Sequence, residues 1–331
     1  MFNPSPELLS SGELYLKTIS WSLPFAAIIL LVAGILQGMG NAKTPMITVG
    51  ILNIVNIVSG YTLIFVLKLD LKGAGYAYNI AYIVASIFGI TMLFGKKGIL
   101  KTKLGKFQFK FDLAESLTIL RLGLPTSFET AFWQGASIFL TRAILTYGEI
   151  PYAAYQLGLQ AESISYMPAT GFGIAATTFV GQALGSRDKE LGNKYLKQLI
   201  KYTIIITIFA GGALIFFPKQ IMGILTNDKE VIAIGAVYLL VMGIVQLPQN
   251  VSGVLNGALR GAGYVKIPMI SAGIGLWGIR VPFALLMTFV FKADIIWIWI
   301  GIGLDMCFRF VFSFIYFKKR DIMDQDTLVI E

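Results

Sequence analysis

Six charged side chains lie inside long apolar stretches of this sequence, and they are the residues that could do chemistry there. They are Glu129, Arg142, Glu162, Arg280, Asp305 and Arg309. Burying such a group in a membrane costs on the order of 3 kcal/mol or more, so it is usually retained for a function. Asp305 and Arg309 are four residues apart and share one helical face, which predicts an ion pair between them.

The three acids of this set outnumber the two arginines that lie near the middle of the predicted spans. One acid is therefore predicted to have no basic partner, and a bound Na⁺ ion or a proton could neutralise it. Glu129 and Glu162 are the leading candidates for this coupling role, Asp305 is the third, and Arg280 and Arg309 are the charge partners. The alternative is a purely structural network of ion pairs, although pairing and coupling can coexist.

The composition indicates that these charges sit in an integral membrane protein. The 331 residues are 56% hydrophobic with a mean hydropathy of +0.73, whereas soluble domains are about 45–50% apolar. Histidine is absent and Cys307 is the only cysteine, which leaves little for disulfides, metal sites or histidine acid–base chemistry. We therefore expect no enzyme activity, no metal site and no organic cofactor.

Nine apolar stretches are long enough to cross about 30 Å of hydrocarbon as helices. We expect an all-α membrane protein with spans at residues 18–38, 46–67, 73–95, 120–147, 152–180, 199–217, 231–257, 269–290 and 294–317. The segment 96–121 carries seven basic residues against Asp112 and Glu115, which marks it as cytoplasmic. Alternate connections then place the C-terminus in the cytoplasm, so the net charge of +9 indicates basic cytoplasmic loops and no nucleic-acid partner.

An internal repeat relates the beginning of the chain to its second half. Residues 34–47, GILQGMGNAKTPMI, recur at 257–270 as GALRGAGYVKIPMI with a constant offset of 223. The glycines allow close packing, the lysine fits a cytoplasmic connection, and the proline starts the next helix. Three spans precede the second copy in its half but none precedes the first, so we expect three N-terminal helices to be absent. The halves would be related by a pseudo-two-fold axis along the membrane normal.

Several motifs resemble those of the multidrug and toxic compound extrusion (MATE) family. They are the run 180–185 (VGQALG) after Tyr166-Met167-Pro168, the two GxLxGxGxxKxPM segments, and Gly123-Leu124-Pro125. The resemblance implies that residues 1–95 are a partial N-lobe with helices four to six, 96–118 the inter-lobe linker, and 119–331 a complete six-helix C-lobe with a short cytoplasmic tail. It also implies a monomeric plasma-membrane antiporter that exports amphipathic or cationic organic compounds in exchange for Na⁺ or H⁺.

The same resemblance bears on where a coupling cation would bind. Family members with an N-lobe site carry an Asn followed four residues later by an Asp, whereas this chain has Asn56 and Gly60. The C-lobe must then supply the site, and the acid that the family commonly carries on its seventh helix supports Glu129.

Helix breakers and aromatic residues predict where substrate binds. Pro168 and Pro248, each followed by glycines, are predicted to bend helices that border the cavity. An aromatic pocket with a few polar groups suits flat organic cations. The candidate lining residues are Phe132, Trp133, Tyr155, Gln156, Tyr166 and Met167.

Two other functions remain open. A chain without three helices could be a non-transporting remnant or an assembly partner, and the same superfamily includes lipid-precursor flippases. A flippase should have a more cationic cavity for phosphates than the few arginines here provide. The segment 107–111, which alternates aromatic and polar residues, is predicted to dock on anionic lipid.

Overall fold

The computed structural model of the chain describes residues 6–95, 112–319 and 322–323, and these are helical apart from short connections. The chain divides into two compact units, Met1–Phe111 and Asp112–Glu331. Most of the predicted linker, including the segment 107–111, lies outside the described residues. The next helix begins at Leu113, so the last part of the predicted linker, residues 113–118, is helical.

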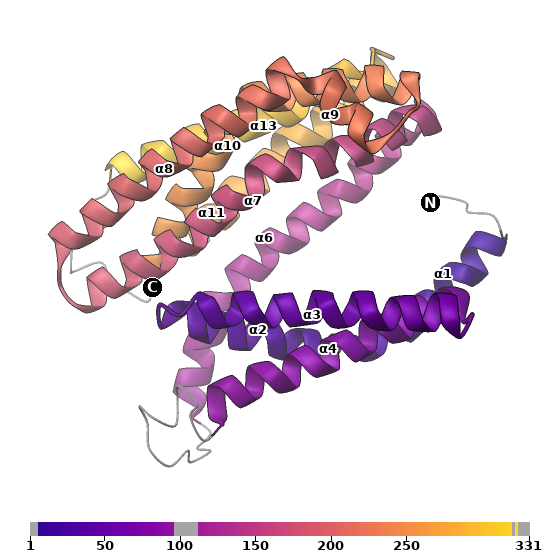
Figure 1. The fold of residues 1–331 in the computed structure, drawn as a ribbon. Helices are drawn as coiled ribbons and strands as arrows, with labels where there is room; N and C mark the ends of the chain where they lie inside the picture. The colour runs from indigo at the N-terminus through magenta and orange to yellow at the C-terminus, as the bar shows by residue number, and fades with distance from the viewer. Residues whose placement is uncertain (1–5, 96–111, 320–321, 324–331) are drawn as a thin grey trace. The chain divides into compact units, whose positions relative to one another are not determined.

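The N-terminal unit is a small helical bundle (Figure 1). Its helices are α1 (Pro6–Ile19), the 3₁₀ turn η1 (Ser20–Ser22), α2 (Leu23–Gly38), α3 (Lys43–Tyr61) with the π-helical end η2 (Thr62–Val66), and α4 (Asp70–Phe94). Helix α4 packs against the other three helices. Its buried Ala77, Ala81 and Ala85 recur every four residues, which lets neighbouring backbones approach closely.

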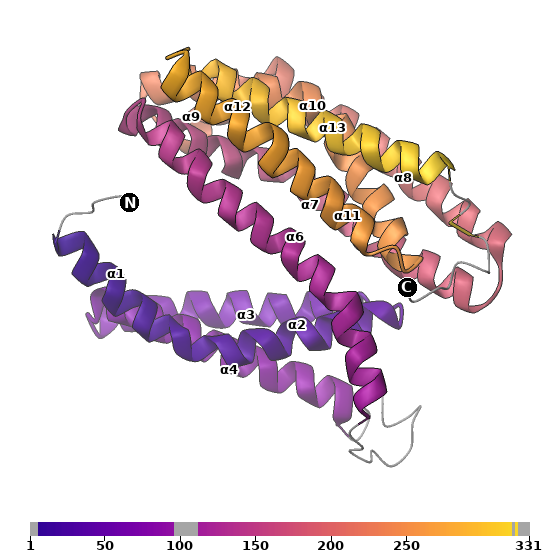
Figure 2. The same ribbon diagram turned by 180° about the vertical axis from the view of Figure 1, so that it is seen from behind.

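The C-terminal unit begins with three long helices. They are α6 (Leu113–Leu145), α7 (Glu149–Gly185) and α8 (Lys189–Phe216), followed by the short α9 (Pro218–Leu225) and the long α10 (Lys229–Gly261). Aspartate side chains begin three of these helices, because Asp112, Asp188 and Asp228 accept hydrogen bonds from free backbone N–H groups of the first turn. Helix α10 packs against α7, α8, α9 and α13, so it forms the centre of the unit (Figures 1 and 2).

The last two long segments differ in regularity. The predicted span 269–290 alternates between α and π geometry as α11 (Lys266–Gly273), η3 (Ile274–Arg280), α12 (Val281–Leu285) and η4 (Leu286–Val290). It packs along α6, as Figure 2 shows. The final helix, α13 (Ile296–Lys319), is a continuous α-helix. A π-helical turn shifts the face that later residues present, and Arg280 is the last residue of η3.

The repeated sequence forms the same local structure in both units. Helix α2 ends at Gly38 and α10 at Gly261, and α3 begins at Lys43 and α11 at Lys266. Gly40 and Gly263 take the left-handed backbone conformation in the turn, with φ of 82° and 88°. The prediction that this motif ends one helix and starts the next is confirmed.

Within the residues that the structure describes, seven helical segments are long and apolar enough to cross a membrane. They are Leu9–Gly38, Lys43–Val66, Asp70–Phe94, Lys189–Phe216, Lys229–Gly261, Lys266–Val290 and Ile296–Lys319. Helices α6 and α7 contain the other two predicted spans, but polar residues interrupt their apolar stretches. Pro168 and Pro248 lie inside α7 and α10, and neither proline ends its helix.

Candidate functional site

Glu162 on α7 is buried among neutral hydrogen-bond donors. Its side chain is 2% exposed. The hydroxyl of Tyr238 donates to Oε2 at 2.5 Å and the amide Nε2 of Gln246 donates to Oε1 at 2.8 Å, both from α10. Among the residues that the structure describes, no lysine or arginine forms an ion pair with it. Glu162 is therefore the deep acid whose charge has no basic partner there.

The hydrogen bonds continue from Glu162 into the interior of the unit. Asn250 donates through Nδ2 to Oε1 of Gln246 at 3.4 Å and to Oγ1 of Thr207 on α8 at 3.0 Å. Gln246, Asn250 and Thr207 are all buried. These contacts link α7, α10 and α8 and limit the positions that the Glu162 carboxylate can take.

Asp305 on α13 pairs with two arginines. Its Oδ2 lies 2.7 Å from Nη2 of Arg280, and its Oδ1 lies 3.1 Å from Nε of Arg309. The predicted pair of Asp305 and Arg309 is confirmed, and Arg280 is an additional partner. Gly275 allows this arrangement, because a Cβ atom there would overlap Oδ1 of Asp305.

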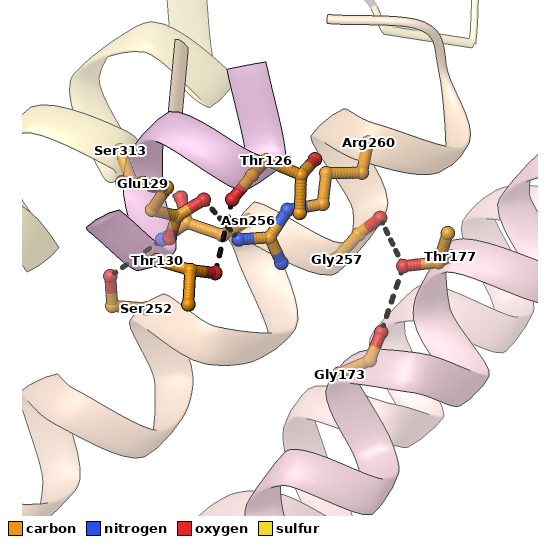
Figure 3. Close-up of polar contacts among 10 residues, drawn as sticks. All are labelled: Thr126, Glu129, Thr130, Gly173, Thr177, Ser252, Asn256, Gly257, Arg260 and Ser313. Atoms are coloured by element: carbon orange, nitrogen blue, oxygen red, sulfur yellow. Dashed lines mark hydrogen bonds and ion pairs between the residues drawn. The ribbon is translucent and has the colours of Figure 1, made fainter. Parts of the chain in front are cut away.

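Glu129 on α6 pairs with Arg260 at the end of α10. The Oε2 atom lies 2.6 Å from Nη2 of Arg260, as Figure 3 shows. The prediction that Glu129 could be the acid without a basic partner is wrong, because Arg260 pairs with it. The predicted span 231–257 ends before Arg260, whereas helix α10 continues to Gly261 and brings the guanidinium of Arg260 to Glu129.

Helices α7 and α10 are in backbone contact next to this ion pair. Thr177 donates its hydroxyl to the carbonyl oxygens of Gly257, at 2.9 Å, and of Gly173, at 3.2 Å (Figure 3). A Cβ atom on Gly257 would overlap the carbonyl of Gly173, and one on Gly261 would overlap that of Thr177. The predicted close packing by the repeat glycines is confirmed for the second copy.

Two cavities inside the C-terminal unit border Glu162 and Glu129, respectively. The first, which we call the aromatic chamber, has a volume of about 290 Å³ and is lined by Trp133, Tyr155, Leu159, Glu162, Tyr166, Tyr238, Gln249, Arg280, Ile302 and Met306. The second, the polar chamber, measures about 200 Å³ and is lined by Glu129, Trp133, Gln249, Ser252, Gly253, Asn256, Arg260, Met306 and Arg309. Trp133, Gln249 and Met306 line both.

Three of the six predicted cavity residues line the aromatic chamber, namely Trp133, Tyr155 and Tyr166. The other three do not line either chamber. Phe132 packs on the cluster around Ala136 and Leu276, Gln156 is exposed and donates to the hydroxyl of Tyr152, and Met167 is 63% exposed.

Polar residues of α10 that were not among the predicted site residues also belong to the site. Tyr238, Gln246 and Asn250 are separated by multiples of four residues, which places them on one helical face. This spacing of polar groups in an apolar span is visible in the sequence and could have predicted these site residues. Gln249 and Arg260, which line the polar chamber, lie on the same helix.

The chain resembles known transporters over nearly its whole length. A family model named MatE matches residues 1–62 and 125–286. A probable multidrug resistance protein NorM of Thermotoga maritima is 30% identical over 98% of this chain and 72% of its own length. The probable multidrug resistance protein YoeA of Bacillus subtilis is 26% identical over 85% of this chain.

The same fold occurs in solved structures. A MOP superfamily transporter from Pyrococcus furiosus superposes with a TM-score of 0.85 at 21% identity, covering 97% of this chain and 72% of that one. The chain spans 62% of the length of YoeA. The prediction that three N-terminal helices are absent is not supported by these matches and stays a prediction.

Proposed function

We propose, on the premise that the chain belongs to the MatE family of multidrug efflux transporters, that it is a secondary active antiporter. It exports amphipathic or cationic organic compounds in exchange for Na⁺ or H⁺. The observation that carries the proposal is Glu162, a buried carboxylate without an ion pair among the described residues, which lines an aromatic chamber. The chemistry is transport alone, with no catalytic residue and no organic cofactor.

The environment of Glu162 would make a coupling ion and a cationic substrate compete for one carboxylate. An isolated carboxylate in a low-dielectric interior is unfavourable unless a proton or a cation neutralises it. A cationic substrate in the chamber and a coupling ion would each neutralise the same charge, so the binding of one disfavours the binding of the other. This mutual exclusion is the thermodynamic requirement of an antiporter.

The aromatic residues of the chamber supply the substrate contacts. Trp133, Tyr155, Tyr166 and Tyr238 line its wall, and the faces of such rings attract organic cations. Tyr155 stacks on Trp299 with the ring centroids 5.4 Å apart, which holds its ring in place.

Glu129 and Asp305 have secondary roles in this proposal. Each is neutralised by arginine, Glu129 by Arg260 and Asp305 by Arg280 and Arg309. The two acids would contribute to coupling by holding these guanidinium groups in position, since the guanidinium groups line the two chambers.

The proposed membrane arrangement includes all nine long helical segments of the described part of the chain. Helices α6 and α7 contain 33 and 37 residues, and about 20 residues suffice to cross the hydrocarbon core. Of their charged residues, Glu129 of α6 and Glu162 of α7 line the chambers. The protein would lie in the plasma membrane as a monomer, in two lobes, with its C-terminus in the cytoplasm.

Ethidium efflux from energised cells that lack their own pumps tests the proposal. The chain should export ethidium, and Glu162→Gln should abolish export driven by an imposed Na⁺ or pH gradient. Glu190→Gln, the same change at an exposed position on α8, should leave export unchanged. Unaltered efflux in the Glu162→Gln variant would exclude this carboxylate as the coupling group, and absence of efflux by the unaltered chain would contradict transport.

A further inference from the structure

Three lysines follow one another along the exposed face of α8, and we call them the lysine row. Lys194, Lys197 and Lys201 are all exposed. Because they are spaced by three and four residues, at about 100° per residue they lie within about 60° of one another around the helix axis. Helix α8 packs against α7 and α10, and its other face carries the buried residues Gly192, Leu196, Leu199, Thr203, Thr207, Gly211 and Leu214. The lysine row therefore points away from these neighbours.

The positive charge of the lysine row is not neutralised by neighbouring side chains. Among the described residues, none of the three lysines forms an ion pair. The only acidic residue of α8 is Glu190, one turn before Lys194, so the row keeps at least two excess positive charges. The tail residue Met323 packs at Gly192, on the opposite face of α8, and does not cover the row.

The same face of α8 becomes apolar beyond Lys201. Ile205 and Ile208 continue the row at spacings of four and three residues, and both side chains are exposed. Gly212 follows four residues later, and no atom lies within 4 Å of a Cβ added there. From Lys201 to Gly212 the helix rises about 16 Å, at about 1.5 Å per residue. This rise is close to half of the hydrocarbon thickness of about 30 Å, so the apolar strip spans one leaflet.

We propose that this face of α8 binds an anionic phospholipid. The phosphate of the headgroup lies among the three lysines, and an acyl chain runs along Ile205 and Ile208 to the open surface at Gly212. Positive charge followed by an apolar strip matches the two parts of such a lipid in their order and in their length. Each lysine near the membrane surface should strengthen the binding of an anionic lipid about fivefold. This inference does not depend on the proposed transport.

A specific site differs from the general attraction between a basic protein and an anionic lipid. General attraction depends on net charge, so removing any three exposed lysines should weaken it alike. A site on α8 predicts that only the lysine row matters. Lys219, Lys229 and Lys292 are exposed and lie on other segments, and they provide a control with the same change in net charge.

Native mass spectrometry of the purified full chain in detergent tests the site. The protein is mixed with phosphatidylglycerol and with phosphatidylcholine of identical acyl chains, and the fraction of chains that retain each lipid gives its apparent dissociation constant. The unaltered chain should bind phosphatidylglycerol more tightly. In the triple variant Lys194→Gln, Lys197→Gln and Lys201→Gln, this affinity should fall about tenfold or more, whereas the affinity for phosphatidylcholine should not change.

The control triple variant Lys219→Gln, Lys229→Gln and Lys292→Gln should bind phosphatidylglycerol like the unaltered chain. An equal loss in both triple variants would show a general effect of net charge and would overturn the site. Equal affinities of the unaltered chain for the two lipids, or no loss in the row variant, would also overturn it.

Two further measurements keep the test decisive. Inorganic phosphate at the concentration of the lipid should not displace phosphatidylglycerol, and displacement would assign the lysines to free phosphate instead of a phospholipid. Lys197→Gln alone should lose about fivefold in affinity, which retains a test if the triple variant does not fold. An unchanged affinity in a folded Lys197→Gln variant would contradict the role of the row.

Discussion

The hydroxyl of Tyr238 on α10 donates a hydrogen bond of 2.5 Å to the Glu162 carboxylate on α7, and both side chains are buried. The ring of Tyr238 packs edge-on against Tyr155 and Trp299, with centroid separations of 5.6 and 5.1 Å. The proposed coupling carboxylate is therefore held by a residue that also belongs to the aromatic core of the unit.

Tyr238→Phe removes this hydrogen bond and keeps the ring. Loss of a bond to a charged group costs about 1.5–3 kcal/mol, so we expect a lower apparent melting temperature and slower ethidium efflux. Tyr202→Phe on α8, where the side chain is exposed, is the matched control. Equal melting temperatures and efflux rates for the two variants would show that the Tyr238 hydroxyl does not support Glu162.

Asp305→Asn should destabilise the protein strongly. The substitution leaves Arg280, which is 5% exposed, without a carboxylate in the interior, and breaking a buried pair in this way costs about 3–5 kcal/mol. Size-exclusion chromatography of the purified protein should show a reduced folded fraction. Asp228→Asn should not, because asparagine also caps a helix. If adding Arg280→Gln to Asp305→Asn fails to recover part of the loss, the unpaired charge is not its cause.

Gly257→Ala should separate α7 from α10. The added Cβ would overlap the carbonyl of Gly173, and overpacking of this kind costs about 1–3 kcal/mol. Thermal unfolding in detergent should occur at a lower temperature than for the unaltered chain. Gly212→Ala on α8, where no atom lies within 4 Å of the new Cβ, should be neutral or slightly stabilising. The same melting temperature for both variants would argue against a tight contact at Gly257.

Trp133→Ala should weaken substrate binding with little effect on stability. The side chain lines both chambers and is 42% exposed, so its loss removes ring contacts with a ligand more than core packing. We expect the KM for ethidium efflux to rise about tenfold. Trp297→Ala, which removes a ring of similar exposure outside both chambers, is the control. An equal rise in KM in that control would remove the support for Trp133 as a substrate contact.

The contacts between residues that are close together along the chain were predictable from the sequence. Asp305 and Arg309 are four residues apart on one helix, so their ion pair follows from helix geometry alone. The repeat likewise predicted a helix end and a helix start, because Gly263 and Pro268 act within one turn of backbone.

The choice of partners between helices was not predictable in the same way. Glu129 and Arg260 are 131 residues apart in the chain, and their contact depends on where α10 ends and how it meets α6. Arg280 reaches Asp305 from the last residue of a π-helical segment, whereas a regular helix over 269–290 was expected. A π-helical turn shifts the faces of later residues, and this sequence offered no signal for it.

The sequence by itself determined an all-helical membrane transporter of the MatE family, the helix boundaries at its repeat, and a set of acids of which one would lack a base. The family follows from the resemblance of several motifs to those of the MATE family, and the other features follow from apolar length, local backbone chemistry and the charged residues counted within the predicted spans. Only the tertiary structure decided that this acid is Glu162, because it pairs Glu129 and Asp305 with arginines from other helices. Such pairs depend on the packing of distant segments, which no local pattern encodes.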